Sequence, residues 1–134
     1  MQSMRIPFTA ALLFVAAIAI GCGGDSESDK VESVLRTYIN HYIDSEPAEM
    51  YALLDSGSQE LCPEERFVAF ISAARDALGE RDFEIVEIRN VVIDGDAASA
   101  TVQSSVDGEP AEATENTLLK EDGDWRLQLP SIGC

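Results

Sequence analysis

Positive charge is scarce in this sequence. The 134 residues include 9 Lys and Arg against 25 Asp and Glu, which gives a formal net charge of −16 at neutral pH. Proteins that bind a phosphate backbone do so through clustered Lys and Arg side chains. We therefore expect no nucleic-acid partner, and no docking on anionic lipid headgroups by charge alone.

Metal-ligating and catalytic patterns are also missing. His41 is the only histidine, and no cluster of Cys or carboxylate residues with metal-ligand spacing accompanies it. The two Asp-Gly-Asp segments at 94–96 and 122–124 do not continue into a full loop of oxygen ligands for calcium, so we interpret them as turns. The sequence predicts no metal, no cofactor and no catalytic residue.

Long apolar runs are absent except near the start of the chain. Residues 8–20 form an apolar run that is shorter than the roughly 20 residues of a transmembrane helix. Before it, residues 1–7 carry one positive charge on Arg5, and after it small residues lead to Cys22. This layout is typical of a cleaved export signal.

The end of this run, Ala19-Ile20-Gly21-Cys22, resembles the lipobox of bacterial lipoprotein precursors. The resemblance implies a signal peptide at 1–21 and a lipid such as palmitate on Cys22. It also implies a domain tethered to a bacterial membrane on the extracytoplasmic side, in the cell envelope. An ordinary secretory signal beside a cysteine and a retained membrane helix are the alternatives.

Cysteine is rare, and its odd count is informative. Of the three cysteines, Cys22 is used if it carries lipid, which leaves Cys62 and Cys134 as a pair. A disulfide between them would close a long loop and stabilise the fold by roughly 4 kcal/mol in the chain-entropy model. A reactive Cys62 thiol at a helix start and an intermolecular bond remain open.

Helical periodicity dominates the first half of the chain after a polar linker at 22–29. We predict a domain at 30–134 that opens with a helix over about 29–43. A short helix follows Ser45, with Pro47 in its first turn, until Ser56-Gly57 ends it. A third helix begins after Cys62, with Pro63 at its first position, and stops at Gly79.

Strand periodicity takes over from Phe83. We predict strands over 83–93, with a bulge at Arg89-Asn90, over about 98–106, over 111–121, and from Trp125 to Leu129. Turn residues separate them at 94–96, 107–110 and 122–124. The fold class is therefore α+β, with N-terminal helices packed on one face of a curved antiparallel sheet.

Several segments of the domain together resemble NTF2-like proteins, the superfamily of ketosteroid isomerase. They are residues 35–39, 44–46, 51–54, 94–96 and 118–127. The resemblance implies a sheet wrapped around a helix to leave a cone-shaped pocket. The residues that could line such a pocket are Tyr38, Tyr42, Phe67, Phe70 and Trp125.

The enzymes of that superfamily use a tyrosine on the first helix to hold an oxyanion and an aspartate on a following strand as base. Tyr38 matches the tyrosine, but residues 56–62 lead directly into a helix, so we expect no base. Our leading hypothesis is a non-catalytic domain that binds a small apolar ligand or an envelope protein. An isomerase or dehydratase using Tyr38 is the alternative, and a stress or assembly factor acting through contacts is a third.

Overall fold

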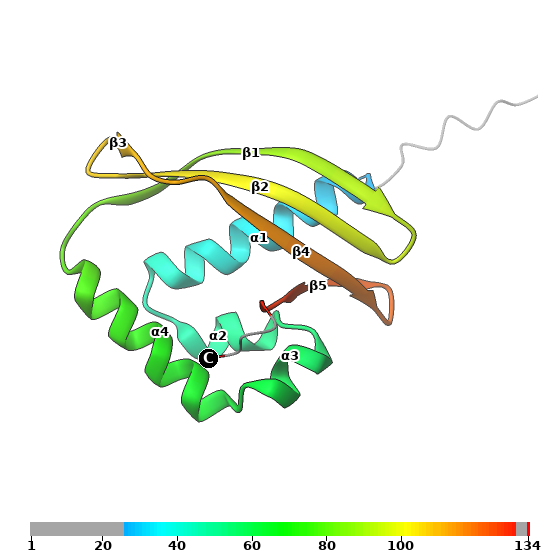
Figure 1. Ribbon diagram of the computed structural model, residues 1–134, viewed down its shortest axis with the longest axis horizontal. Helices are drawn as coiled ribbons and strands as arrows, with labels where there is room; N and C mark the ends of the chain where they lie inside the picture. The colour runs from blue at the N-terminus through cyan, green and yellow to red at the C-terminus, as the bar shows by residue number, and fades with distance from the viewer. Residues whose placement is uncertain (1–25, 131–133) are drawn as a thin grey trace, which may run out of the picture.

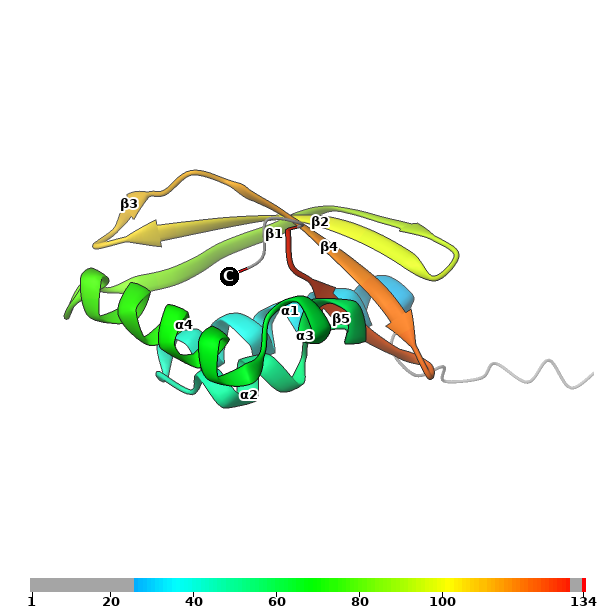
Figure 2. The same cartoon turned by 60° about the horizontal axis from the view of Figure 1, so that its bottom comes forward.

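The computed structural model describes residues 26–130 and 134. Cys22 and the expected signal peptide lie outside them. The helices are α1 (Glu27–Ile43), α2 (Pro47–Ala52), α3 (Ser56–Leu61) and α4 (Glu64–Leu78). The strands are β1 (Phe83–Asp94), β2 (Ala97–Val106), β3 (Glu109–Pro110), β4 (Thr114–Glu121) and β5 (Asp124–Gln128). The helices lie on one side of a curved antiparallel sheet, which confirms the predicted α+β class (Figures 1 and 2).

Helix α1 begins earlier than the expected start at residue 29. Ser26 and Asp29 form a reciprocal capping box, in which each side chain accepts a hydrogen bond from the other's backbone N–H at 3.1 Å. Residues 27–29, predicted to belong to the linker, form the first turn of the helix. Val31 and Leu35 then point into the core and are fully buried.

The segment after α2 differs from the expectation. Helix α2 already ends at Ala52, and Ser56-Gly57 open α3 instead of ending α2. The Asp55 side chain caps α3 by accepting a hydrogen bond from the backbone N–H of Ser58. An aspartate three residues before a free N–H is a favoured helix cap, and this local preference outweighs the glycine. Helix α4 follows with Pro63 as its N-cap and stops at Gly79, whose φ of 67° suits a residue without a side chain.

The sheet has the order β1-β2-β4-β5, with the short β3 paired to β2. Its register shifts between Arg89 and Val92, where Asn90 has a φ of 54°, so the predicted bulge is confirmed. The β4–β5 turn has positive φ at Asp122 and Gly123, as two-residue hairpins require. The strand predicted over 111–121 begins only at Thr114 as β4, and the short β3 lies within the predicted turn at 107–110.

One carboxylate joins the start of α1 to the last hairpin. Glu27 Oε2 accepts hydrogen bonds from Lys120 Nζ at 2.8 Å and from the buried Trp125 Nε1 at 2.9 Å. Its Oε1 accepts another from Lys30 Nζ at 2.8 Å. The hydrogen bond from Lys120, followed by those from Lys30 and Trp125, lowers the pKa of Glu27 from its ordinary value of 4.5 to about 2.

This low pKa predicts an acid-dependent loss of stability. Because the pKa is lower in the folded state, the contribution of Glu27 is fully present above pH 4.5 and is lost as the pH falls towards 2. The melting temperature of Glu27→Gln should therefore fall less steeply than that of the wild type in this window. Parallel melting curves at several pH values test this, and identical slopes would contradict it.

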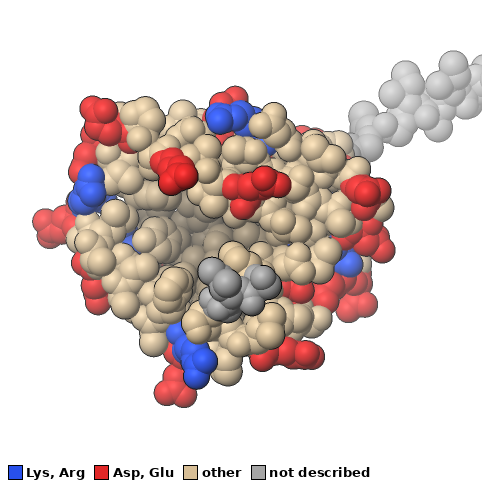
Figure 3. Space-filling model, in the orientation of Figure 1, with Lys and Arg blue, Asp and Glu red and all other residues tan. Residues whose placement is uncertain are grey.

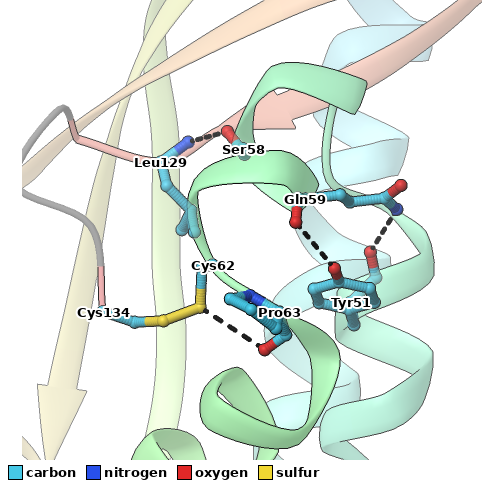
Figure 4. Close-up of a disulfide and its surroundings, with 7 residues drawn as sticks. All are labelled: Tyr51, Ser58, Gln59, Cys62, Pro63, Leu129 and Cys134. Carbon is cyan, nitrogen blue, oxygen red and sulfur yellow. Dashed lines mark hydrogen bonds between the residues drawn. A yellow bond between two sulfur atoms is a disulfide. The ribbon is translucent and has the colours of Figure 1, made fainter.

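The chain end is fastened to the helical layer (Figure 4). A disulfide joins Cys62, directly after α3, to Cys134, with their Cα atoms 5.7 Å apart and a sequence separation of 72 positions. This is the pairing that the cysteine count favoured. Nearby, the Leu129 N–H donates to Ser58 Oγ at 2.8 Å. Leu129 and Cys134 are thus held against the corner between α3 and α4.

We expect the disulfide to carry a large part of the stability of a domain this small. Replacing both cysteines in Cys62→Ser/Cys134→Ser should lower the free energy of unfolding by roughly 4 kcal/mol, because the unfolded chain regains the entropy of a long loop. Denaturant titration measures the loss. A reducing agent should destabilise the wild type and leave the double variant unchanged, and equal stabilities would refute the prediction.

Candidate binding cavity

A cavity of about 730 Å³ lies between the helices and the end of the sheet. Its wall is formed by one residue of α1, the start and end of α3, the first half of β4 and the end of β5. The lining residues are Tyr38, Asp55, Gly57, Ser58, Leu61, Thr114, Glu115, Asn116, Thr117, Leu127, Gln128, Leu129 and Pro130. Figure 3 shows this face hollowed between sheet and helices, with acidic side chains on several sides of the opening.

Tyr38 contributes the phenol of the wall. Its hydroxyl has no hydrogen-bond partner among residues 26–130 and 134, in contrast to that of Tyr51, which donates to the Gln59 carbonyl at 3.0 Å. Burial raises the pKa of Tyr38 to about 12, so the hydroxyl stays neutral at physiological pH. It is therefore available both to donate and to accept a hydrogen bond from a ligand.

Backbone hydrogen bonds fix Asp55 in the wall of the cavity. Its backbone N–H donates to the Leu127 carbonyl at 2.8 Å, and the Leu127 N–H donates to the Leu53 carbonyl at 2.9 Å. Leu54 and Leu127 thereby form a single parallel bridge between the helical layer and β5. Asp55 thus follows a very short early strand on the edge of the sheet.

No early strand is visible in the sequence at this point, whereas the structure places Asp55 directly after a one-residue bridge. The strand is one bridge long, too short to show alternating hydrophobicity, and Leu53-Leu54 look like the inner face of α2 in the sequence. The local clue was the spacing of Asp55 and Ser58, which is that of a helix cap. The structure brings Asp55 and Tyr38 to the same cavity.

The Asp55 carboxylate is only partly satisfied. The residue is 4% exposed, and its Oδ1 accepts the Ser58 N–H at 3.2 Å. Its Oδ2 accepts no hydrogen bond from the described part of the chain. Gly57 leaves it room, since a Cβ there would lie 3.2 Å from Oδ2.

The charged side chains of the described lining are all acidic. Asp55 and Glu115 contribute carboxylates, and the described lining residues include no Lys, Arg or His. Apolar surface comes from Leu61, which is 64% exposed, and from Leu127 and Leu129. The cavity thus combines an apolar wall with hydrogen-bonding groups that are polar or negative.

Only Tyr38 among the five expected pocket residues lines this cavity. Tyr42 packs edge-on against Phe83, with their ring centroids 5.7 Å apart, and Phe67 packs against Tyr51 in the core at 5.6 Å. Tyr42 thus packs against β1 and Phe67 against α2, so both rings have aromatic partners that do not line the cavity. An apolar stripe in the sequence does not distinguish a core position from a cavity wall.

The other two expected residues lie elsewhere. Phe70 is 57% exposed on α4, whereas Trp125 is buried and donates a hydrogen bond to Glu27. A second hollow of about 290 Å³ lies beside Trp125. Its lining residues are Lys30, Val34, Gly123, Asp124, Trp125 and Arg126.

His41 lies outside both hollows, with its Nδ1 2.6 Å from Glu46 Oε2. Within residues 26–130 and 134, no three His, Cys, Asp or Glu side chains are grouped so that they could hold a metal ion. In the same part of the chain, no helix is both long enough and apolar enough to cross a membrane.

Comparison with known proteins identifies the fold but no family. No family model matches the sequence, and no curated protein matches it. Solved structures do match. One is assigned as a calcium/calmodulin-dependent protein kinase type II association domain from Thiobacillus denitrificans. It has a TM-score of 0.58 and 13% identity, over 72% of this chain and 87% of that one.

Two further solved structures also match this chain. A protein assigned as an NTF2-like transpeptidase from Campylobacter jejuni matches with a TM-score of 0.52 and 18% identity, over 75% of this chain and 98% of that one. One assigned as a scytalone dehydratase from Novosphingobium aromaticivorans has a TM-score of 0.50 and 17% identity, over 76% and 80%. At these identities the likeness shows the fold alone, and that fold is NTF2-like, as predicted.

Proposed function

We propose that this protein is a lipoprotein of the bacterial cell envelope whose NTF2-like domain binds a small ligand without altering it. The observation that carries the proposal is the cavity. Its volume of about 730 Å³ is in the range of small-molecule sites. Two groups in its wall, the Tyr38 hydroxyl and Asp55 Oδ2, have hydrogen-bonding capacity that the described residues leave unused.

The anchoring part of the proposal rests on the sequence. The apolar run at 8–20 and the lipobox-like Ala19-Ile20-Gly21-Cys22 support lipid attachment to Cys22. Helix α1 starts at Glu27, so at most about 17 Å of extended chain would separate the lipidated residue from the fold. A lipid on Cys22 would therefore keep the domain close to the membrane surface.

Replacing the lipidated residue tests the anchor. Cys22→Ser should move the protein from the membrane fraction to the soluble fraction or stop its maturation, because stable anchoring needs attached acyl chains. Fractionation and intact-mass analysis measure both effects. Asp76→Asn, at an exposed position of α4, serves as the control and should stay with the membrane. An unmodified Cys22 at the mature end of the wild type would contradict the proposal.

Binding is tested on protein solubilised from its own membrane. Native mass spectrometry should show the chain with an additional small-molecule mass. Both Tyr38→Phe and Asp55→Asn should carry less of it, because each removes one anchoring group. The exposed variant Asp76→Asn should retain the same mass as the wild type. Finding wild-type protein with no bound small molecule, and no uptake from an envelope extract, would count against binding.

One observation favours a second candidate, an isomerase or dehydratase. Asp55 and Tyr38 line one cavity, so a carboxylate that could take a proton and a phenol that could hold an oxyanion are both available. Binding needs only the geometry already described, whereas turnover also needs a substrate atom held between the two groups. Isomerisation of a 3-oxo-Δ5-steroid that is lost in both Tyr38→Phe and Asp55→Asn would favour the enzyme.

A further inference from the structure

We infer that the cavity selects an amine: a small amphipathic molecule whose protonated amino group meets Asp55 and whose apolar body lies on the leucine wall. The inference rests on the proposed binding function, because it names the class of ligand for the same cavity. Three features of the lining carry it: a buried and partly unsatisfied carboxylate, the absence of a lining cation, and an apolar side chain left exposed.

Asp55 provides the first feature. A carboxylate that is 96% buried is costly unless its oxygens are paired, yet only Oδ1 has a partner in the described chain. The side chain has little freedom to reach solvent instead, because its own N–H is fixed to Leu127 and its Oδ1 to Ser58. An ammonium group in the cavity would supply both a hydrogen bond and the opposite charge to Oδ2.

The remaining charges of the lining act in the same direction. Glu115 is the second carboxylate, and no cationic side chain lines the described cavity. The chain as a whole has a formal charge of −16, which raises the local concentration of cations. A carboxylate or phosphate ligand would meet two like charges without a counter-charge, so the site disfavours anions.

Tyr38 suits the same head group. The neutral phenol oxygen accepts a hydrogen bond from an N–H donor, and the face of the ring attracts a cation within about 6 Å of its centre. Since burial keeps the hydroxyl protonated well beyond neutral pH, its role as a neutral partner does not change over the physiological range.

Leu61 indicates what the rest of the ligand is like. It lines the cavity and is 64% exposed, although the next residue, Cys62, is fully buried. Leu127, Leu129 and Pro130 continue this apolar wall. A hydrocarbon skeleton of the ligand would cover it and contribute the hydrophobic part of the binding energy.

Three probes with one skeleton test the head group: 1-adamantylamine, 1-adamantanol and adamantane-1-carboxylate. We would titrate each at pH 7 into the full chain in zwitterionic nanodiscs and follow the amide resonances of Ser58 and Leu129. These amides flank the cavity, so partition of a probe into lipid does not mimic binding. The amine should bind at least about tenfold more tightly than the alcohol, and the carboxylate should bind most weakly.

The Asp55→Asn variant assigns the preference to one group. Asparagine caps helices as well as aspartate does, so α3 should persist while the charge is lost. The advantage of the amine over the alcohol should fall to about threefold or less. Asp76→Asn removes one exposed carboxylate from α4, outside the cavity, and should keep the wild-type preference.

Each other result has a definite meaning. Equal binding of amine and alcohol, or tightest binding of the carboxylate, overturns the inference and leaves small-molecule binding standing. Absence of amide shifts with all three probes contradicts both proposals. A preference that survives in Asp55→Asn removes Asp55 from its assigned role. The wild-type comparison alone decides the ligand class, so the test does not depend on the folding of the variant.

Discussion

The structure depends on the attachment of the α2–α3 connection to the end of the last strand. Leu127 exchanges backbone hydrogen bonds with Leu53 and Asp55, and Ser58 accepts the Leu129 N–H two residues further along. The disulfide from Cys62 to Cys134 continues the same seam covalently. These contacts fix one edge of the helical layer on the sheet. The sheet curves over the helical layer (Figure 2). Residues of this seam, together with the first half of β4, line the cavity.

The same seam explains how an aspartate comes to line the cavity. The residue directly after the Leu54–Leu127 bridge is buried, and in this chain that residue is an aspartate. At the other end of the layer, Glu27 ties α1 to Lys120 and Trp125, so α1 is held against the last hairpin and presents Tyr38 to the cavity. The two carboxylates thus differ in their hydrogen bonding. Both oxygens of Glu27 accept hydrogen bonds that hold the fold together, whereas Asp55 Oδ2 accepts none from the described residues.

The fold leaves the function open. Its solved neighbours include proteins assigned as a kinase association domain, a transpeptidase and a dehydratase. Such a fold supports binding and catalysis alike, and only the groups in the cavity separate them. In this chain those groups are a phenol, two carboxylates and an apolar wall, without a lining cation in the described residues. These groups define the charge and polarity of the cavity, but they do not by themselves define a reaction.

Local patterns in the sequence determined most of the fold. Helical stripes, the glycine stop at Gly79, the bulge at Asn90 and the Asp-Gly turns depend on neighbours a few residues apart, so they can be read from the chain. The pairing of Cys62 with Cys134 followed from counting. Only the tertiary structure decided the site. The bridge that places Asp55 joins residues 73 positions apart, from Leu54 to Leu127, and is too short to leave a periodic trace. Tyr38 and Tyr42 share one helical stripe, but their surroundings come from distant segments. Phe83 and Arg75 pack against the Tyr42 ring, whereas Tyr38 lines the cavity.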